Sequence, residues 1–148
     1  MSKCIWMVDD QANRPTVERL QMVGTKQDTV EVKNYCGTGK TELFAKDVAK
    51  HSISPQDYFI LDCFMPVPLV IKLGKFWNGQ AVDARYCGFA LAKWLCETKS
   101  INQNNIILCS AFQDFAQRKA DFGLGSELEC WDGWQSMTVL RLRKWLQI

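Results

Sequence analysis

Short apolar runs alternate with amphipathic stretches along the whole chain. Continuous apolar segments at 4–8, 58–62 and 105–111 have the length of strands. The segment 28–35 alternates apolar and polar residues, as a strand with one solvated face does, and 127–131 is a short fifth strand. Because the strands of a parallel sheet are buried on both faces, they give continuous apolar runs of this kind. The pattern therefore predicts a parallel sheet.

Helical patterns separate these strands. Pro15 lies in the first turn of the first helix, Ser136 is placed to cap the last one, and Gly123 stops the fourth. Strand–helix order repeated five times predicts an α/β domain, with helices on both faces of a five-stranded sheet. A length of 148 residues fits one domain, 1–148. The predicted helices span 13–26, 41–51, 88–99, 113–122 and 136–148.

Residues 67–87 do not fit this alternation. They form an insertion between the third strand and the third helix, where most connections have only about 2–6 residues. The insertion contains Lys72 and Lys75 together with the aromatic residues Phe76 and Trp77. It is interpreted as a surface hairpin without a catalytic role, or as a segment that folds over a site and supplies a cation. Its aromatic residues also suit a partner interface.

Composition and charge exclude several classes of protein. A net charge of +2 gives no support for nucleic-acid or membrane binding, and no apolar run approaches the roughly 20 residues that span a bilayer. The seven cysteines include no CxxC pair, which argues against a disulfide framework and a zinc cluster and favours the reducing cytoplasm. The single histidine, His51, argues against His-based catalytic triads.

Polar residues stand where the predicted buried strands end. Asp9 and Asp10 follow the first strand, Asp62 ends the third, and Ser110 follows the fourth. In a parallel α/β sheet these ends meet at one edge, where ligands bind. Carboxylates gathered there repel one another unless a cation neutralises them or some are protonated. Oxygen ligands suit Mg²⁺, and a carboxylate beside it can accept a phosphoryl group. The residues predict a metal site, with solvated strand-end caps as the alternative.

A second candidate is the stretch "GTGKT", Gly37–Thr41. It is similar to a phosphate-binding loop, but the first glycine of that pattern falls at Asn34. A glycine turn before a helix is the favoured interpretation. Nucleotide binding remains a further hypothesis.

Three motifs in this arrangement resemble the receiver domain of two-component response regulators: the acids at 9–10, "LDCFMP" at 61–66 and "CSA" at 109–111. The resemblance covers essentially the whole chain. It implies a flavodoxin-like strand order 2-1-3-4-5 and transfer of a phosphoryl group from a histidine kinase or phosphotransfer protein to Asp62, with Mg²⁺ or Mn²⁺ as cofactor. The resemblance further implies that a downstream protein recognises the phosphorylated state. It also implies a homodimer through the last two helices and the fifth strand.

The resemblance also implies roles for individual residues. Asp9, Asp10 and Asp62 match the metal-binding acids, and the backbone carbonyl of Phe64 matches a further metal ligand. Ser110 matches the hydroxyl residue that moves toward the phosphoryl group, and Ala111 matches the small residue beside it.

Two positions depart from the family pattern. In a gapless alignment of 123–131, Cys130 replaces the lysine that pairs with the phosphoryl group, and Glu127 replaces the aromatic switch residue. A buried thiol is neutral and cannot supply the missing charge. The hypothesis that Lys72 or Lys75 substitutes for that lysine follows from this departure.

The sequence leaves several functions open. A receiver that is phosphorylated on Asp62 and signals through protein contacts is the favoured interpretation, with any catalysis limited to its own phosphorylation and dephosphorylation. The alternative is a degenerate receiver that serves as a phosphorylation-independent interaction or dimerisation module. A phosphatase is disfavoured, because Asp62 is followed two residues later by Phe64 rather than by a second acid.

Overall fold

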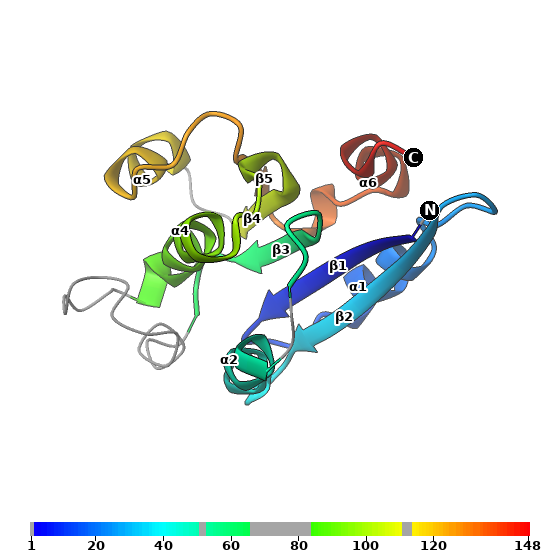
Figure 1. Ribbon diagram of the computed structural model, residues 1–148, viewed down its shortest axis with the longest axis horizontal. Coiled ribbons are helices and arrows are strands. Elements are labelled where there is room, and N and C mark those ends of the chain that lie inside the picture. The colour runs from blue at the N-terminus through cyan, green and yellow to red at the C-terminus, as the bar shows by residue number, and fades with distance from the viewer. Residues whose placement is uncertain (1, 51–52, 66–83, 111–113) are drawn as a thin grey trace.

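A five-stranded parallel sheet forms the centre of the molecule (Figure 1). The computed structural model describes residues 2–50, 53–65, 84–110 and 114–148. The strand order β2-β1-β3-β4-β5 confirms the predicted flavodoxin-like order. The strands are β1 (Ser2–Asp9), β2 (Thr29–Cys36), β3 (Tyr58–Asp62), β4 (Ile106–Ser110) and β5 (Glu129–Asp132).

The described residues form five α-helices, which are labelled as in Figure 1. None of these helices has the length and apolar character needed to cross a membrane. Three short 3₁₀ helices accompany them: η1 (Ala84–Tyr86), η2 (Gln103–Asn105) and η3 (Trp134–Ser136). The α-helices are α1 (Arg14–Gln21), α2 (Lys40–Lys50), α4 (Cys87–Lys99), α5 (Phe115–Asp121) and α6 (Val139–Leu146).

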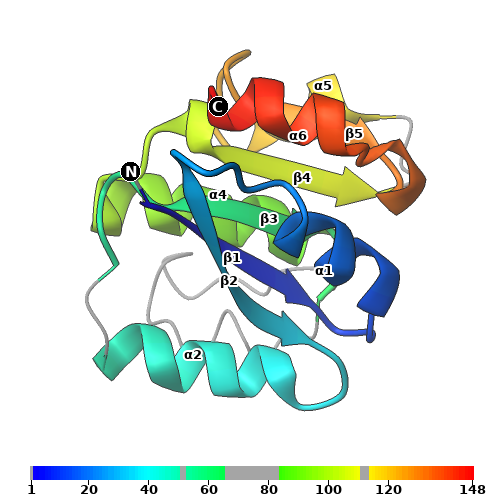
Figure 2. The same ribbon diagram turned by 90° about the vertical axis from the view of Figure 1, so that its right-hand side faces the viewer.

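Helices cover both faces of the sheet, as the continuous apolar strands predicted. Phe59 packs in a core with residues of α2 and α4, whereas its neighbour Ile60 packs with residues of α1 and α6 on the opposite face. Figure 2 shows α1 and α6 in front of the sheet and α4 behind it. Both side chains are fully buried, and burying a residue of this kind stabilises the fold by about 1.5–3 kcal/mol.

Polar contacts join α1 and α6, although the two helices lie at opposite ends of the sequence. The Arg19 guanidinium donates to the carbonyl of Met137 at 3.4 Å. Arg143 Nε donates to the carbonyl of Val23 at 3.0 Å. Each bond links one helix to the segment that flanks the other, since Met137 precedes α6 and Val23 follows α1.

The last strand and the last helix both begin later than predicted. β5 runs from Glu129 to Asp132 instead of 127–131, because a separate turn at 126–127 and a bend at 128 precede the strand. The N-cap of α6 is Thr138, whose Oγ1 accepts from the amide of Arg141 at 3.2 Å. Ser136 instead donates its hydroxyl to the carbonyl of Gly133 at 2.8 Å, so the predicted cap at Ser136 was wrong.

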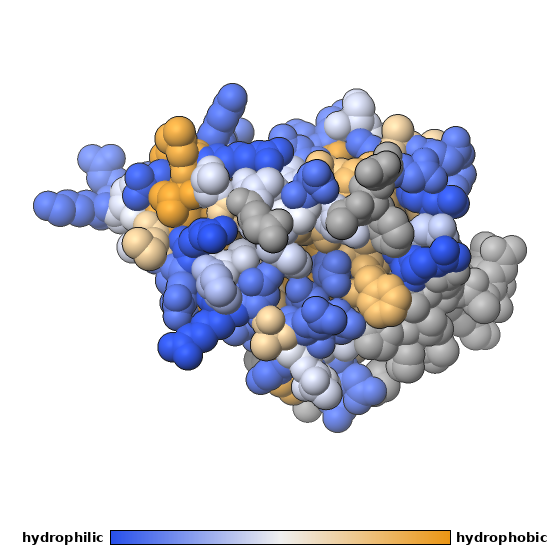
Figure 3. Space-filling view, turned by 180° about the vertical axis from the view of Figure 1, so that it is seen from behind, coloured by the Kyte–Doolittle hydropathy of each residue, from blue (hydrophilic) through white to orange (hydrophobic). Residues whose placement is uncertain are grey.

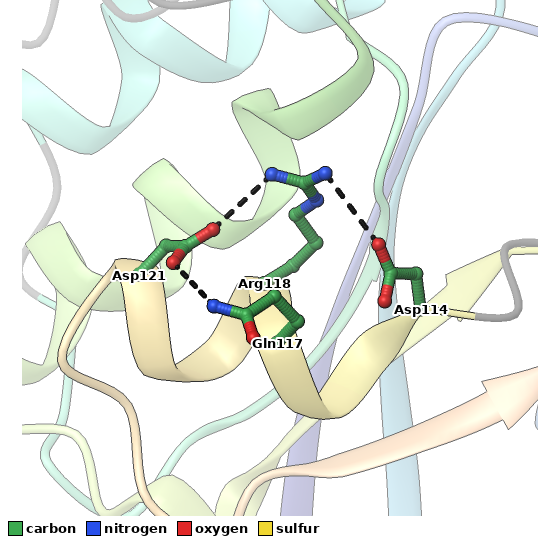
Figure 4. Close-up of polar contacts among 4 residues, drawn as sticks. All are labelled: Asp114, Gln117, Arg118 and Asp121. Carbon is green, nitrogen blue, oxygen red and sulfur yellow. Dashed lines mark hydrogen bonds and ion pairs between the residues drawn. The ribbon is translucent and has the colours of Figure 1, made fainter.

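Helix α5 has no fully buried residue, but its Phe115 packs against Phe89 of the core, and polar contacts at the surface add to this packing. Figure 4 shows Arg118 between two carboxylates, with Nη1 at 3.1 Å from Asp121 and Nη2 at 3.5 Å from Asp114. Gln117 donates to the same Asp121 at 2.9 Å. The Arg118 guanidinium also lies 4.5 Å from the ring centroid of Tyr86 in η1. Since ion pairs this exposed contribute little, they orient α5 more than they stabilise it.

The molecular surface is mostly hydrophilic. The face in Figure 3 shows blue and white residues around a few separate orange patches. Among the described residues, the large hydrophobic side chains that are exposed come from different elements, and such scattered residues are normal for a folded protein. They are Met22, Leu43, Phe64 and Leu140.

Candidate functional site

Three carboxylates meet at the carboxyl ends of the central strands. Asp9 ends β1 and is followed by Asp10, whereas Asp62 ends β3, the neighbour of β1 in the sheet. One oxygen from each lies within 4.8 Å of the others. The structure therefore brings together the three acids that the sequence predicted to converge.

These acids line a cleft of about 350 Å³, which we call the acidic cleft. Its walls combine polar and aromatic side chains, and Phe64 remains 46% exposed. The predicted residue Ser110 ends β4 and lies in the same wall. The residues that line the acidic cleft are Asp9, Asp10, Gln11, Asp62, Phe64, Ser110, Gly133 and Trp134.

Burial and mutual repulsion change the acidity of two of these carboxyl groups. Asp9 is only 3% exposed, and burial raises its pKa to about 6 even though Oδ1 accepts a hydrogen bond from the amide of Gln11 at 3.0 Å. Burial, followed by the charges of Asp9 and Asp10, raises the pKa of Asp62 to about 8. Without a cation, the cluster therefore retains protons at neutral pH.

The donor set fits a hard divalent cation. Mg²⁺ binds oxygen ligands at about 2.0–2.1 Å, so oxygens on opposite sides of the ion are about 4 Å apart. Three carboxylate oxygens within 4.8 Å of one another are compatible with that spacing. A cation there would also neutralise the repulsion that raises the pKa of Asp62. Phe64 lines the cleft, and its carbonyl as a further ligand stays a prediction.

A glycine holds the backbone beneath Asp62 in place. Gly88, in the first turn of α4, donates its amide to the carbonyl of Cys63 at 2.9 Å. A Cβ atom at Gly88 would overlap the carbonyl oxygen of Asp62 and lie 2.7 Å from the Cα of Cys63. Only glycine allows α4 to pack this closely against the end of β3.

Cys130 and Glu127, which depart from the family pattern, do not line the acidic cleft. Cys130 pairs with Leu108 inside the sheet, whereas Asp132, at the end of β5, pairs with Ser110. Burial raises the pKa of the Cys130 thiol to about 11. That Cys130 replaces a lysine of the family stays a prediction, and in the structure Cys130 is not among the residues that line the acidic cleft. Glu127 is exposed and precedes β5.

Three further predicted residues lie outside the described part of the chain. They are Lys72, Lys75 and Ala111, and most of the insertion 67–87 is outside it too. The hypothesis that a lysine from the insertion supplies a cation therefore stays a prediction.

The stretch Gly37–Thr41 forms the turn between β2 and α2. Gly37 and Gly39 have φ values of 127° and 76°, a region that favours glycine. The Gly37 amide donates to the carbonyl of Asp9 at 3.2 Å, so the turn lies beside the end of β1. None of its residues lines the acidic cleft, and its geometry agrees with the favoured interpretation as a glycine turn.

Sequence reasoning missed four residues that shape the site. Gln11 follows the paired acids, and Gly133 and Trp134 form the turn after β5. Gly88 was predicted only as the first residue of the helix at 88–99. The signal for the turn was present, since an acid and a glycine directly follow the apolar strand, but the predicted strand ended one residue early at 131.

Comparison with protein-family models, with curated proteins and with solved structures finds no match. Any functional assignment must therefore be argued from the acidic cleft and the fold that positions it.

Proposed function

We propose that this protein is a receiver-like signalling switch that accepts a phosphoryl group on Asp62 and holds Mg²⁺ or Mn²⁺ with Asp9, Asp10 and Asp62. One observation carries the proposal: three carboxylate oxygens lie within 4.8 Å of one another in a cleft at the carboxyl edge of a parallel sheet. That edge is where open α/β sheets bind their ligands. Ser110 lines the same cleft and has a hydroxyl to donate.

The transfer step uses Asp62 as the nucleophile. The proton that Asp62 holds at neutral pH leaves to solvent, and a carboxylate oxygen then forms a bond to phosphorus. The bond between phosphorus and the donor's leaving group breaks, and that group departs with the electron pair; with acetyl phosphate it is acetate. A divalent cation, when bound, would offset part of the negative charge of the cluster and of the phosphoryl oxygens.

The proposed partners follow from this chemistry and from the resemblance. A histidine kinase or phosphotransfer protein would donate the phosphoryl group, and a downstream protein would read the phosphorylated state. We place the protein in the cytoplasm, and its cysteines support this proposal. All seven are free thiols, as is usual in a reducing compartment.

A second candidate function is a degenerate receiver that binds partners without phosphorylation. The observation in its favour is the charge of the acidic cleft: among the described residues, none that lines it is a lysine or arginine. Strand β5 also ends in an acid, Asp132, which pairs with Ser110 in the register of β4 and β5. If no cation from elsewhere in the chain compensates, the cleft would retain a phosphoryl group poorly.

Intact mass spectrometry separates the two candidates. The protein is incubated with acetyl phosphate, with and without Mg²⁺, beside Asp62→Asn and a matched control, Asp132→Asn. This control removes an acid at the same sheet edge that does not line the cleft. We expect a Mg²⁺-dependent gain of one phosphoryl group in the wild type and the control, and none in Asp62→Asn. No gain in folded wild-type protein would favour the degenerate receiver.

A further inference from the structure

The acidic cleft needs a hydrogen-bond donor to hold a phosphoryl group. Three carboxylates line it, and the lining residues described by the structure include no cationic side chain. One divalent cation would offset only part of this charge, and the side-chain donors that the described lining offers to phosphoryl oxygens are neutral. The lining side chains that can donate are the amide of Gln11, the hydroxyl of Ser110 and the indole of Trp134. Ser110 also forms a hydrogen bond with the Cys63 thiol.

The backbone of Trp134 is fixed at the rim of the cleft by the turn after β5. The Gly133 amide donates to the carbonyl of Trp131 at 3.0 Å, which reverses the chain directly after the strand. Gly133 adopts a φ of 76°, a region that favours glycine. The amide of Met137 then donates to the carbonyl of Trp134 at 3.2 Å and closes η3. The half-buried Trp134 is thus held on a short, hydrogen-bonded turn.

The indole of Trp134 differs from most other indoles in the protein. Trp6 donates its N–H to Asp57, Trp131 to Glu129, and Trp145 to the carbonyl of Asn104, at 2.9–3.0 Å. A tryptophan N–H that is removed from solvent normally has such a partner. Within the described residues, Trp134 and Trp94 have none, and Trp134 is the one of these two that lines the acidic cleft.

We infer that Trp134 binds the phosphoryl group by donating its indole N–H to a phosphoryl oxygen on Asp62. The inference rests on the function proposed above and deepens it by naming a binding residue. An indole donor suits this position because it adds no charge when the phosphoryl group is absent. A hydrogen bond to a charged oxygen is strong enough that its loss weakens binding by about tenfold or more.

Nuclear magnetic resonance of the indole N–H groups tests the contact directly. Protein labelled with ¹⁵N is recorded alone, with Mg²⁺, and with Mg²⁺ plus beryllofluoride, which mimics a phosphoryl group on a carboxylate. The Trp134 signal is identified by its absence from Trp134→Phe. We expect it to move downfield with beryllofluoride and much less with Mg²⁺ alone. A Trp134 signal that stays in place, while backbone amides near Asp62 shift, would overturn the inference.

Affinity measurements use a matched pair of variants. Trp134→Phe keeps an aromatic wall and removes the N–H, and Trp94→Phe removes an equally unpartnered N–H from α4, away from the cleft. We expect Trp134→Phe to weaken beryllofluoride binding about tenfold at unchanged Mg²⁺ affinity, and Trp94→Phe to match the wild type. Equal loss in both variants would assign the effect to stability and reject the inference.

The failure of this inference is distinguishable from the failure of the proposed function. If folded wild-type protein binds Mg²⁺ but shows no response to beryllofluoride and no gain in mass with acetyl phosphate, the phosphoryl-acceptor function fails, and the role of Trp134 fails with it. If the wild type responds and Trp134→Phe responds equally, only the role of Trp134 fails.

Discussion

Two hollows of nearly equal size lie at opposite edges of the sheet, and charge distinguishes them. The acidic cleft has a volume of about 350 Å³ and gathers three carboxylates at the carboxyl ends of the strands. The other, which we call the tryptophan hollow, has about 360 Å³ and lies where β4 and β5 begin. It is lined by Asn104, Asn105, Glu127, Glu129, Trp131, Arg141, Lys144, Trp145 and Gln147.

The charges that line the tryptophan hollow are of both signs, and one of its acids has a hydrogen-bond partner within the hollow. Glu129 accepts from the Trp131 indole at 3.0 Å, and the Arg141 guanidinium lies 3.9 Å from the centroid of the same ring. Two acids and two basic residues line this hollow. In the acidic cleft, by contrast, Asp9 and Asp62 repel each other and their pKa values rise. Volume alone therefore says little about function, whereas uncompensated like charges mark the acidic cleft as the candidate site.

The largest expected effect comes from the backbone that supports the acidic cleft. Gly88→Ala would place a Cβ against the carbonyl of Asp62 and should lower the free energy of unfolding by about 3 kcal/mol or more. Urea unfolding measures it. Gly125→Ala is the matched control, because its new Cβ would meet only the ends of the Gln103 and Glu127 side chains. Equal stability of Gly88→Ala and the wild type would contradict the role of this close contact.

Removing a charge should have opposite effects in the two hollows. Asp62→Asn relieves repulsion among buried acids and should raise the free energy of unfolding by about 2 kcal/mol, in metal-free protein near pH 8. Glu129→Gln weakens the acceptor for the Trp131 indole and should lower it by about 0.5–1 kcal/mol. Urea unfolding in the presence of a chelator measures both. Destabilisation by Asp62→Asn would show that repulsion does not govern the cleft.

The pH dependence of stability should report the same repulsion. Because the pKa values of Asp9 and Asp62 rise to about 6 and 8 on folding, the folded protein binds more protons than the unfolded chain above about pH 4. The free energy of unfolding should therefore fall as pH rises toward 8, by about 1 kcal/mol between about pH 6.5 and 7.5. Thermal or urea unfolding without metal measures this slope.

Two comparisons sharpen the pH experiment. Asp62→Asn should flatten the slope above about pH 6, because the group with the highest carboxyl pKa is gone. Saturating Mg²⁺ should flatten it as well, since the cation replaces the bound protons. Stability that rises between pH 6 and 8 in metal-free wild-type protein would exclude the proposed acid cluster as its main determinant.

The smallest expected effect lies in the tryptophan hollow. Arg141→Ala removes a cation from the face of Trp131 and should lower the free energy of unfolding by about 0.5–1 kcal/mol. The change in melting temperature on adding Mg²⁺ should stay as in the wild type, because Arg141 lies away from the acidic cleft. A loss of the Mg²⁺ response in this variant would show that the two hollows are coupled.

The sequence predicted most of the fold and the centre of the site for local reasons. β3 has the predicted bounds, because an apolar run that ends at one acid leaves little ambiguity. Asp9, Asp10, Asp62 and Ser110 meet because parallel strands must end at the same edge.

The features that the sequence could not predict depend on contacts between distant segments. The need for glycine at Gly88 is set by the path of β3 past the first turn of α4, which no local pattern records. Trp134 lies in a short turn with no periodicity. The position of Cys130 relative to the acidic cleft depends on the pairing of β4 with β5, which sets Cys130 beside Leu108 and Asp132 beside Ser110.

The contacts between α1 and α6 have a consequence for how the protein is made. Arg143 bonds to the carbonyl of Val23, and Leu142 and Leu146 share a core with Met7 of the central strand. During translation the ribosome completes β1 and α1 long before α6, so the part of this sheet face that α6 covers stays exposed until α6 has emerged. A nascent chain paused before Leu142 would present that apolar face to chaperones and proteases.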